Sequence, residues 1–429
     1  MFIARIARIA PVIAISSALI TTVPGCQESR QSNTSAPVDR VQGWRSDISF
    51  WLDKVREQHY VYKTKPLPKQ LLDAAEDLSQ NVHRFSDERA LYEMQRLAAF
   101  IGDGHTYVLP LAAERVPGSM MPIRFYLFSD GMYVVDAMPG FEKWIGSRLE
   151  TIGSATTAQL EQGMKETISA DNSNAWKWIG PPFMNLRGAI ESMTGLTGDS
   201  IPVVLRDRNG QLQRVKFATY PPPRLQGIPK LIPSRMPGTS APPLWLRSVS
   251  KTFWTESLDD RTLYVQFNQV MNDQNRSLKE YAAEMRSRLV ERKPSRVILD
   301  VRHNNGGNSY LFPPIIDALL EWENADASRK LYVLMGRNTF SAAQNFIAQL
   351  DKRTRAIFVG EPSSSSPNFV GEENNFQLPW SGATISISNR YHENIPGDKR
   401  KWIEPDIPVA LSSRDYFAGR DPVLESLIK

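Results

Sequence analysis

The sequence predicts a mixed α/β protein with a helical region first, a small β-rich module second and a larger core of alternating strands and helices. Three observations lead to this prediction. Apolar residues recur at helical spacing between Trp44 and Ile101, short apolar runs with hairpin turns follow over 121–218, and strand and helix patterns alternate from Thr262 onward. With 429 residues the chain has a length typical of two or three domains.

Residues 1–26 have the pattern of a secretory signal. Arg5 and Arg8 precede an apolar run over 9–23, which is shorter than the roughly 20 residues that a membrane-spanning helix needs. The signal ends at Cys26, the only cysteine of the chain, and this ending resembles a bacterial lipoprotein signal in which the cysteine carries the lipid. We therefore expect lipidation of Cys26, with an ordinary cleaved signal as the alternative.

Residues 27–43 are polar and rich in Ser, Asn and Thr, which is typical of a flexible tether. Gln27, which follows the cysteine, does not favour retention in the inner membrane. We expect a lipid-anchored protein of the cell envelope, on the outer membrane facing the periplasm if the cell is Gram-negative.

The composition excludes several classes of function. A single cysteine rules out an internal disulfide framework and a Cys-based zinc site. Without the signal, 49 basic residues stand against 46 acidic ones, and a net charge of +3 is too diffuse for a nucleic-acid footprint. Motifs for metals and nucleotides do not appear, so we expect no metal, no cofactor and no nucleic-acid partner.

A helical region is expected over 44–115, with Ser86 as a helix start. The glycines of Gly102-Asp103-Gly104-His105-Thr106 end the last helix and form a turn. His59 and His83 fall on polar helix faces, where solvated or structural roles are expected.

The β-rich module is expected over 116–220, with a helix near 157–168 and hairpin turns at Asp130-Gly131 and Asn209-Gly210. Its expected strands are 123–127, 132–135, 148–152 and 202–205. Residues 221–255 are rich in proline, which predicts a linker.

The core is expected over 256–429. Its alternating pattern predicts an open sheet, largely parallel at its centre, with helices packed on it. The expected strands are 263–267, 296–300, 330–335 and 356–359, and the expected helices are 278–291, 310–322 and 341–351. In such a sheet, sites form where loops leave the carboxyl ends of the strands.

Two of these loops carry residues suited to chemistry. Gly306-Gly307 forms a polar turn that lets backbone N–H groups point at a ligand. Ser341 stands at the first turn of a helix, beside the free N–H of Ala342. This arrangement suits an acyl-transfer nucleophile with an oxyanion hole, but a serine at this place is more often only a helix cap.

Six motifs occur in a fixed order along the chain. They are Leu299-Asp300-Val301-Arg302, Asn305-Gly306-Gly307, Thr339-Phe340-Ser341-Ala342-Ala343, Val359-Gly360-Glu361-Pro362, Leu378-Pro379 and Glu404-Pro405-Asp406-Ile407. From about Trp44 to Leu427 the chain resembles the serine peptidase family of tail-specific (C-terminal processing) proteases, the tricorn core and the interphotoreceptor retinoid-binding protein modules. The resemblance implies a ClpP/crotonase-like core, and a PDZ-like or family-specific module over 116–220.

The family holds two catalytic designs. Tail-specific proteases use a lysine shortly after the Gly-Glu-Pro turn, but this chain has no lysine between Lys352 and Lys399. The tricorn-like branch uses an N-terminal histidine, and Asp103-Gly104-His105-Thr106 matches the Asp-x-His-Thr pattern of that branch. The resemblance thus implies the tricorn-like design, with His105 as the base for Ser341.

The same resemblance implies the remaining groups of the site. The N–H groups of Gly307 and Ala342 would form the oxyanion hole. In tricorn-like members a hydroxyl beside the histidine and a carboxylate near the Pro-Asp-Ile segment steady the base. Gly104 stands at the place of that hydroxyl, and Asp398 is the nearest carboxylate to the place of the acid, with Asp103 as its competitor.

We therefore expect a serine-type peptidase that acts on a peptide or protein substrate. The alternative is a non-catalytic ligand- or peptide-binding lipoprotein on the same fold, because the retinoid-binding modules use this scaffold for ligand carriage. His303 is expected to line the cleft, and His392 to lie in a polar loop.

Overall fold

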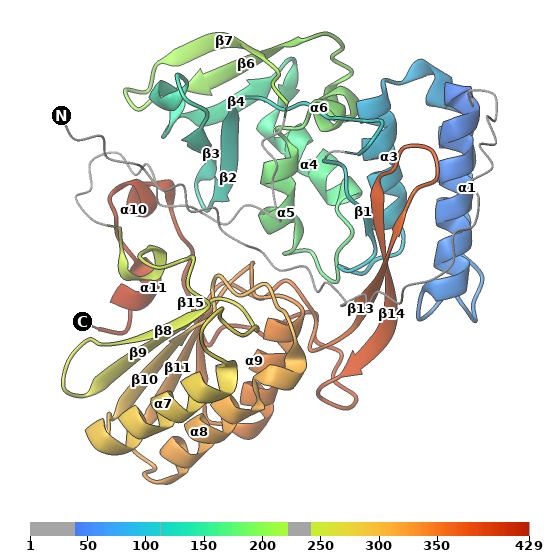
Figure 1. Ribbon diagram of the computed structural model, residues 1–429. Coiled ribbons are helices and arrows are strands. Elements are labelled where there is room, and N and C mark those ends of the chain that lie inside the picture. Colours follow the sequence, from blue (N-terminus) through green and yellow to red (C-terminus); the bar gives the residue numbers. More distant parts are fainter. Residues whose placement is uncertain (1–38, 112, 222–241, 429) are drawn as a thin grey trace, which may run out of the picture.

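The computed structural model describes residues 39–111, 113–221 and 242–428, which form three β-sheets with helices packed around them (Figure 1). The expected signal, with Cys26, and most of the expected tether and Pro-rich linker lie outside the described residues. Over the three described ranges, no helix combines the length and the apolar character needed to cross a membrane.

Three helices form the N-terminal region, as expected: α1 (Arg40–Gln58), α2 (Lys69–Asn81) and α3 (Asp87–Ala99). Their apolar faces enclose a common core around Trp44. Ser86 caps α3 with its side chain, as the sequence indicates. Helix α1 begins at Arg40, inside the expected tether over 27–43, because Arg40 forms an ion pair with Asp87 at the start of α3 (2.6 Å).

A long hairpin, formed by β13 (Asn368–Gln377) and β14 (Thr384–Glu393), packs against these helices (Figure 1). Strand β1 (Tyr107–Val108) pairs antiparallel with β14. Ile385 and Ile387 of β14 share the core of Trp44, which corrects the expectation that the hairpin residues belong with the core over 256–429. His392 lies on β14 rather than in a loop.

The β-rich module has the expected strands and two unexpected helices. Its sheet consists of β2 (Ile123–Phe128), β3 (Gly131–Ala137), β4 (Arg148–Ile152), β5 (Ala155–Thr156), β6 (Ser200–Arg206) and β7 (Leu212–Ala218). Helix α4 (Thr157–Thr167) is present as expected, whereas α5 (Trp176–Phe183) and α6 (Arg187–Thr194) are additional. Pro181 and Pro182 inside α5 hide its helical character in the sequence.

The core sheet has the order β15-β12-β11-β10-β9-β8 and is parallel except for β8. Its strands are β8 (Phe253–Ser257), β9 (Thr262–Phe267), β10 (Arg296–Asp300), β11 (Lys330–Met335), β12 (Ile357–Gly360) and β15 (Ile407–Pro408). Helices α7 (Leu278–Arg292), α8 (Pro313–Asn324) and α9 (Ala342–Arg353) cover one face (Figure 1).

The other face of this sheet packs on the C-terminal helix α11 (Pro422–Glu425), which follows α10 (Ser413–Phe417). The side chains of successive residues in each strand point to opposite faces of the sheet. Val297 and Leu299 of β10 pack under the long helices, whereas Ile298 packs with Val423 of α11. The sheet is therefore buried on both sides, which explains the continuous apolar runs in the sequence.

Candidate active site

The loop that leaves β11 brings Ser341 to the start of α9. Ser341 has a φ of +55° and a ψ of −124°, a conformation that residues other than glycine rarely adopt. Its side chain does not cap the helix, although Ser341 stands at the N-cap position. The Ser341 Oγ lies instead 2.8 Å from the Nε2 of His105, a residue 236 positions away in the sequence. The fold thus brings together the expected nucleophile and the expected base.

His105 stands on the turn after α3 and is buried, with only 6% of its surface exposed. Burial lowers the pKa of His105 to about 4, although the charge of Asp103 acts to raise it. The ring is therefore neutral near pH 7 and ready to accept a proton. In the tautomer that lets Nε2 accept the Ser341 hydroxyl proton, the ring proton is on Nδ1, which has no hydrogen-bond partner among the described residues.

Asp103 holds the turn that carries His105 rather than the ring itself. Its buried carboxylate accepts five hydrogen bonds, from the N–H groups of His105 and Thr106, Thr106 Oγ1, Ser388 Oγ and His59 Nε2. Burial by itself would raise the pKa of Asp103, but the hydrogen bonds from His59 and Ser388 outweigh it and lower the pKa. Asp103 is therefore ionised and fixes the backbone of His105.

His59 belongs to this network, which its expected place on a polar helix face did not indicate. Its Nδ1 accepts the N–H of Val61 at 3.1 Å, so its Nε2 carries a proton and donates to Asp103 at 2.8 Å. His59 is 2% exposed, whereas His83 is exposed, as expected. The signal for His59 was weak, because it stands just after the last turn of α1, where periodicity ends.

Asp398 does not reach His105 in the structure. Its carboxylate is paired with Arg400 at 2.7 Å, and Arg400 also pairs with Asp351 at the surface side of α9. Asp398 and Arg400 stand two positions apart, and this local pairing occupies the carboxylate. Of the two expected acids, the structure therefore places only Asp103 beside His105.

Gly104 is required by the packing of Phe340. A side-chain carbon at Gly104 would lie 2.6 Å from the Phe340 ring, so the ring occupies the space where a hydroxyl side chain would stand. The N–H of Gly104 donates to the Oδ1 of Asp171 at 2.9 Å. A backbone group thus makes the polar contact at this position.

Asp171, between α4 and α5, is a further member of the site that the sequence did not indicate. Burial raises the pKa of Asp171 to about 7, and the charge of Asp103 adds to this rise. Ser169, two residues earlier, donates to the carbonyl of Asp103, and Asn172 donates to the carbonyl of Ser363. This segment therefore joins the turn of His105 to the loop that follows β12.

The Gly306-Gly307 turn lies directly against the nucleophile. A side-chain carbon at Gly306 would lie 2.7 Å from the Ser341 Cβ, and one at Gly307 would lie 2.2 Å from the carbonyl oxygen of Val270. Both glycines have positive φ values, of +115° and +132°. In the described chain the N–H groups of Gly307 and Ala342 form no hydrogen bond, so both remain available as donors.

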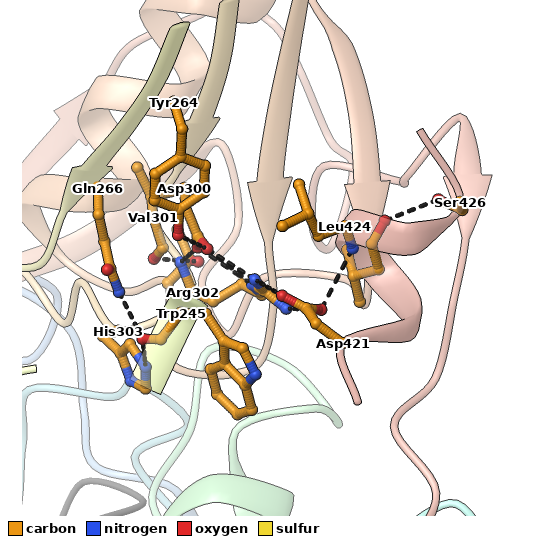
Figure 2. A network of polar contacts seen from close by, with 12 residues as sticks. Trp245, Tyr264, Gln266, Asp300, Val301, Arg302, His303, Asp421, Leu424 and Ser426 are labelled. Atoms are coloured by element: carbon orange, nitrogen blue, oxygen red, sulfur yellow. Dashed lines mark hydrogen bonds and ion pairs between the residues drawn. The ribbon is translucent and has the colours of Figure 1, made fainter. Parts of the chain in front are cut away.

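A buried ion-pair network anchors the start of this turn (Figure 2). Arg302 pairs with Asp300 at 2.6 Å and, through both of its terminal nitrogens, with Asp421 at 2.8 Å. His303 does not line the cleft as expected. It is buried against Trp245, with ring centroids 5.1 Å apart, and its Nε2 contacts the Trp245 carbonyl.

A second ion pair holds the nucleophile loop. Arg337 pairs with Glu361 of the Gly-Glu-Pro motif at 2.6 Å and donates to the carbonyl of Leu127 in β2. The stretch after the motif, where a tail-specific protease would have its lysine, consists of serines, and those at 363–365 are buried. Glu361 therefore has a structural partner in the loop of Ser341.

A strained serine at a helix start, a neutral histidine on its hydroxyl and two free backbone donors are the groups that a serine hydrolase site requires. Residues 261–409 match the model of peptidase family S41. This match confirms the resemblance to that family of serine peptidases seen in the sequence. A search among curated proteins finds no match.

Solved structures with a similar fold include mature CPAF, with a TM-score of 0.61 and 15% identity over 91% of this chain and 96% of that chain. The structure of mature CPAF complexed with lactacystin has a TM-score of 0.59 and 16% identity, over 88% and 96%. The photosystem II D1 C-terminal processing protease is similar at a TM-score of 0.40 and 12% identity, over 85% and 93%. The CPAF likeness shows a shared mixed α/β fold with a helical N-terminal region.

Proposed function

We propose that this protein hydrolyses peptide bonds with Ser341 as the nucleophile and His105 as the general base. The observation that carries the proposal is the 2.8 Å contact between the Ser341 Oγ and the His105 Nε2. Membership of a serine peptidase family supports a peptide or protein as the substrate.

The reaction follows from these positions. The Ser341 Oγ attacks the carbonyl carbon while the Nε2 of His105 takes the hydroxyl proton. The N–H groups of Gly307 and Ala342 stabilise the negative oxygen of the tetrahedral intermediate. His105 then gives its proton to the leaving amine, and a water molecule releases the acyl group from Ser341 by the same steps.

Covalent labelling tests this assignment. A fluorophosphonate should modify the wild-type protein on Ser341, because among the described serines this one is paired with a neutral histidine. The Ser341→Ala variant should remain unmodified. A folded wild-type protein that binds peptides but is neither labelled nor active would favour the alternative of a non-catalytic binding protein on the same fold.

We also propose a ClpP/crotonase-like core and a PDZ-like or family-specific module over 116–220. The parallel order of β9, β10, β11 and β12 with helices on both faces supports the first assignment. The antiparallel sheet with α4 beside it supports the second.

The location in the cell envelope is proposed from the signal and Cys26. Cys26→Ser should move the protein from the membrane fraction to the soluble envelope fraction, because the lipid would have no attachment point. Fractionation followed by immunoblotting measures this change. An unchanged membrane fraction for Cys26→Ser would contradict lipidation.

A further inference from the structure

Four aromatic rings stand in a row through the candidate site. Phe340, next to Ser341, stacks on the His105 ring with centroids 4.5 Å apart and planes inclined by 20°. Phe369 of β13 stacks on the same ring at 5.7 Å and 12°. His392 of β14 follows, stacked on Phe369 at 5.0 Å and 26°.

Phe340 and Phe369 both stack on the imidazole of His105. Both rings are close to parallel with it, and no ring contact joins the two phenyl rings within the described ranges. They come from separate parts of the chain, the nucleophile loop and the hairpin. The His105 ring thus stacks on two phenyl rings that are held by different parts of the chain, and these two rings are called the aromatic clamp.

The clamp occupies the role that a carboxylate on Nδ1 has in other serine hydrolases. Such a carboxylate orients the ring and stabilises the positive imidazolium that forms during the reaction. Asp103 is bonded to the backbone N–H of His105, and the Nδ1 atom has no partner in the part of the chain that the structure describes. An aromatic face within about 6 Å attracts a cation, and both phenyl rings meet this distance.

We propose that Phe340 and Phe369 are positioning residues that hold the His105 ring toward Ser341 and stabilise its positive charge through their π faces. The inference rests on the proposed function of His105 as the base. It also accounts for Gly104, because a larger residue there would displace the Phe340 ring.

Two titratable groups face the His105 ring from the elements packed around it. Asp103, on the turn of His105, favours the charged ring, whereas His392, on β14, disfavours it when protonated. Burial lowers the pKa of His392, so this second ring is neutral near pH 7. Neither group changes charge near neutral pH. Asp171, which accepts a hydrogen bond from the N–H of Gly104, has a pKa of about 7 and does change charge there, so wild type and variants are compared over the same pH range.

Phe369→Leu tests the proposal, because leucine keeps an apolar side chain but has no π face. The rate constant for fluorophosphonate labelling of Ser341 at pH 7 should fall about 10-fold. The acidic limb of the pH profile should move to lower pH, because an imidazolium without the π face is less stable and gives up its proton more easily. Phe369→Tyr keeps the face and should stay within about two-fold of the wild type.

Phe376→Leu is the matched control, since Phe376 lies on the same strand but packs against the N-terminal helices. This variant should leave the labelling rate constant and the acidic limb of the pH profile unchanged. If Phe369→Leu does not fold, Phe369→Met fills the space with a flexible side chain and takes its place. The proposal would be overturned if Phe369→Leu had the labelling rate constant and the acidic limb of the wild type. It would also be overturned if Phe369→Leu and Phe369→Tyr lost the same factor in labelling rate.

A titration of the His105 ring protons by NMR separates this proposal from the proposed function. Phe369→Leu should lower the midpoint of that titration whether or not the protein cleaves peptides. A wild type that is not labelled would overturn the proposed function alone. An unchanged midpoint in a labelled protein would overturn the aromatic clamp alone.

Discussion

His105→Ala should abolish the labelling of Ser341 by a fluorophosphonate, with a loss on the order of 1,000-fold in rate, because a general base contributes about 10² to 10⁴. The Ser341 hydroxyl is a weak nucleophile without a base, and the Nε2 of His105 at 2.8 Å is the basic atom bonded to it. Circular dichroism should show that the variant remains folded.

Lys352→Ala is the control for this prediction, because a lysine base is the other design known for the family. Lys352 lies on the exposed side of α9, and its loss should leave the labelling rate within about two-fold of the wild type. The opposite pattern, with labelling lost in Lys352→Ala and retained in His105→Ala, would contradict the assignment of His105 as the base.

Asp103→Asn should reduce the labelling rate about 100-fold, because an amide nitrogen would meet groups that themselves donate hydrogen bonds. Five donors converge on the Asp103 carboxylate, including the N–H of His105 and the Nε2 of His59. The turn that carries His105 would therefore shift away from Ser341.

Asp398→Asn is the matched substitution, with the same change of group at the acid that the sequence favoured. Its ion pair with Arg400 lies away from His105, so the labelling rate should not change by more than about two-fold. A large loss in Asp398→Asn, together with a near-normal Asp103→Asn, would show that the acid near the Pro-Asp-Ile segment acts on the site.

Much of the fold could be predicted from the sequence, because local patterns report burial. The strand at 296–300 is apolar because both faces of its sheet are covered, and its observed bounds are the expected ones. Ser86 marks the start of α3 through a local hydrogen bond. Helix α5 was missed because its two prolines stand in its second turn, where a proline usually breaks a helix.

The hairpin of β13 and β14 was assigned to the wrong neighbours for a different reason. Its partner β1 stands more than 250 residues earlier in the chain, as in the pairing of Tyr107 with Ser386. The sequence shows that Ile385 and Ile387 are apolar on one face, but not which core that face enters. Long-range pairing of this kind has no local signal.

The candidate site also contains some residues that the sequence predicted and others that it did not. Ser341, His105 and the Gly306-Gly307 turn carry motifs, and the structure places them together. Asp171 and Phe369 belong to no motif. Asp171 contacts Gly104, 67 positions away, and Phe369 contacts His105, 264 positions away. Such contacts form only once the chain is folded.

The central claim is that Ser341 is the residue through which this protein cleaves peptide bonds. The most direct measurement is peptide cleavage against the fraction of Ser341 that carries a fluorophosphonate adduct, determined by peptide mapping. Activity should fall in proportion to the labelled fraction and reach zero at one adduct per chain. A fully labelled protein that still cleaves peptides, or one inactivated by an adduct on another residue, would contradict the account.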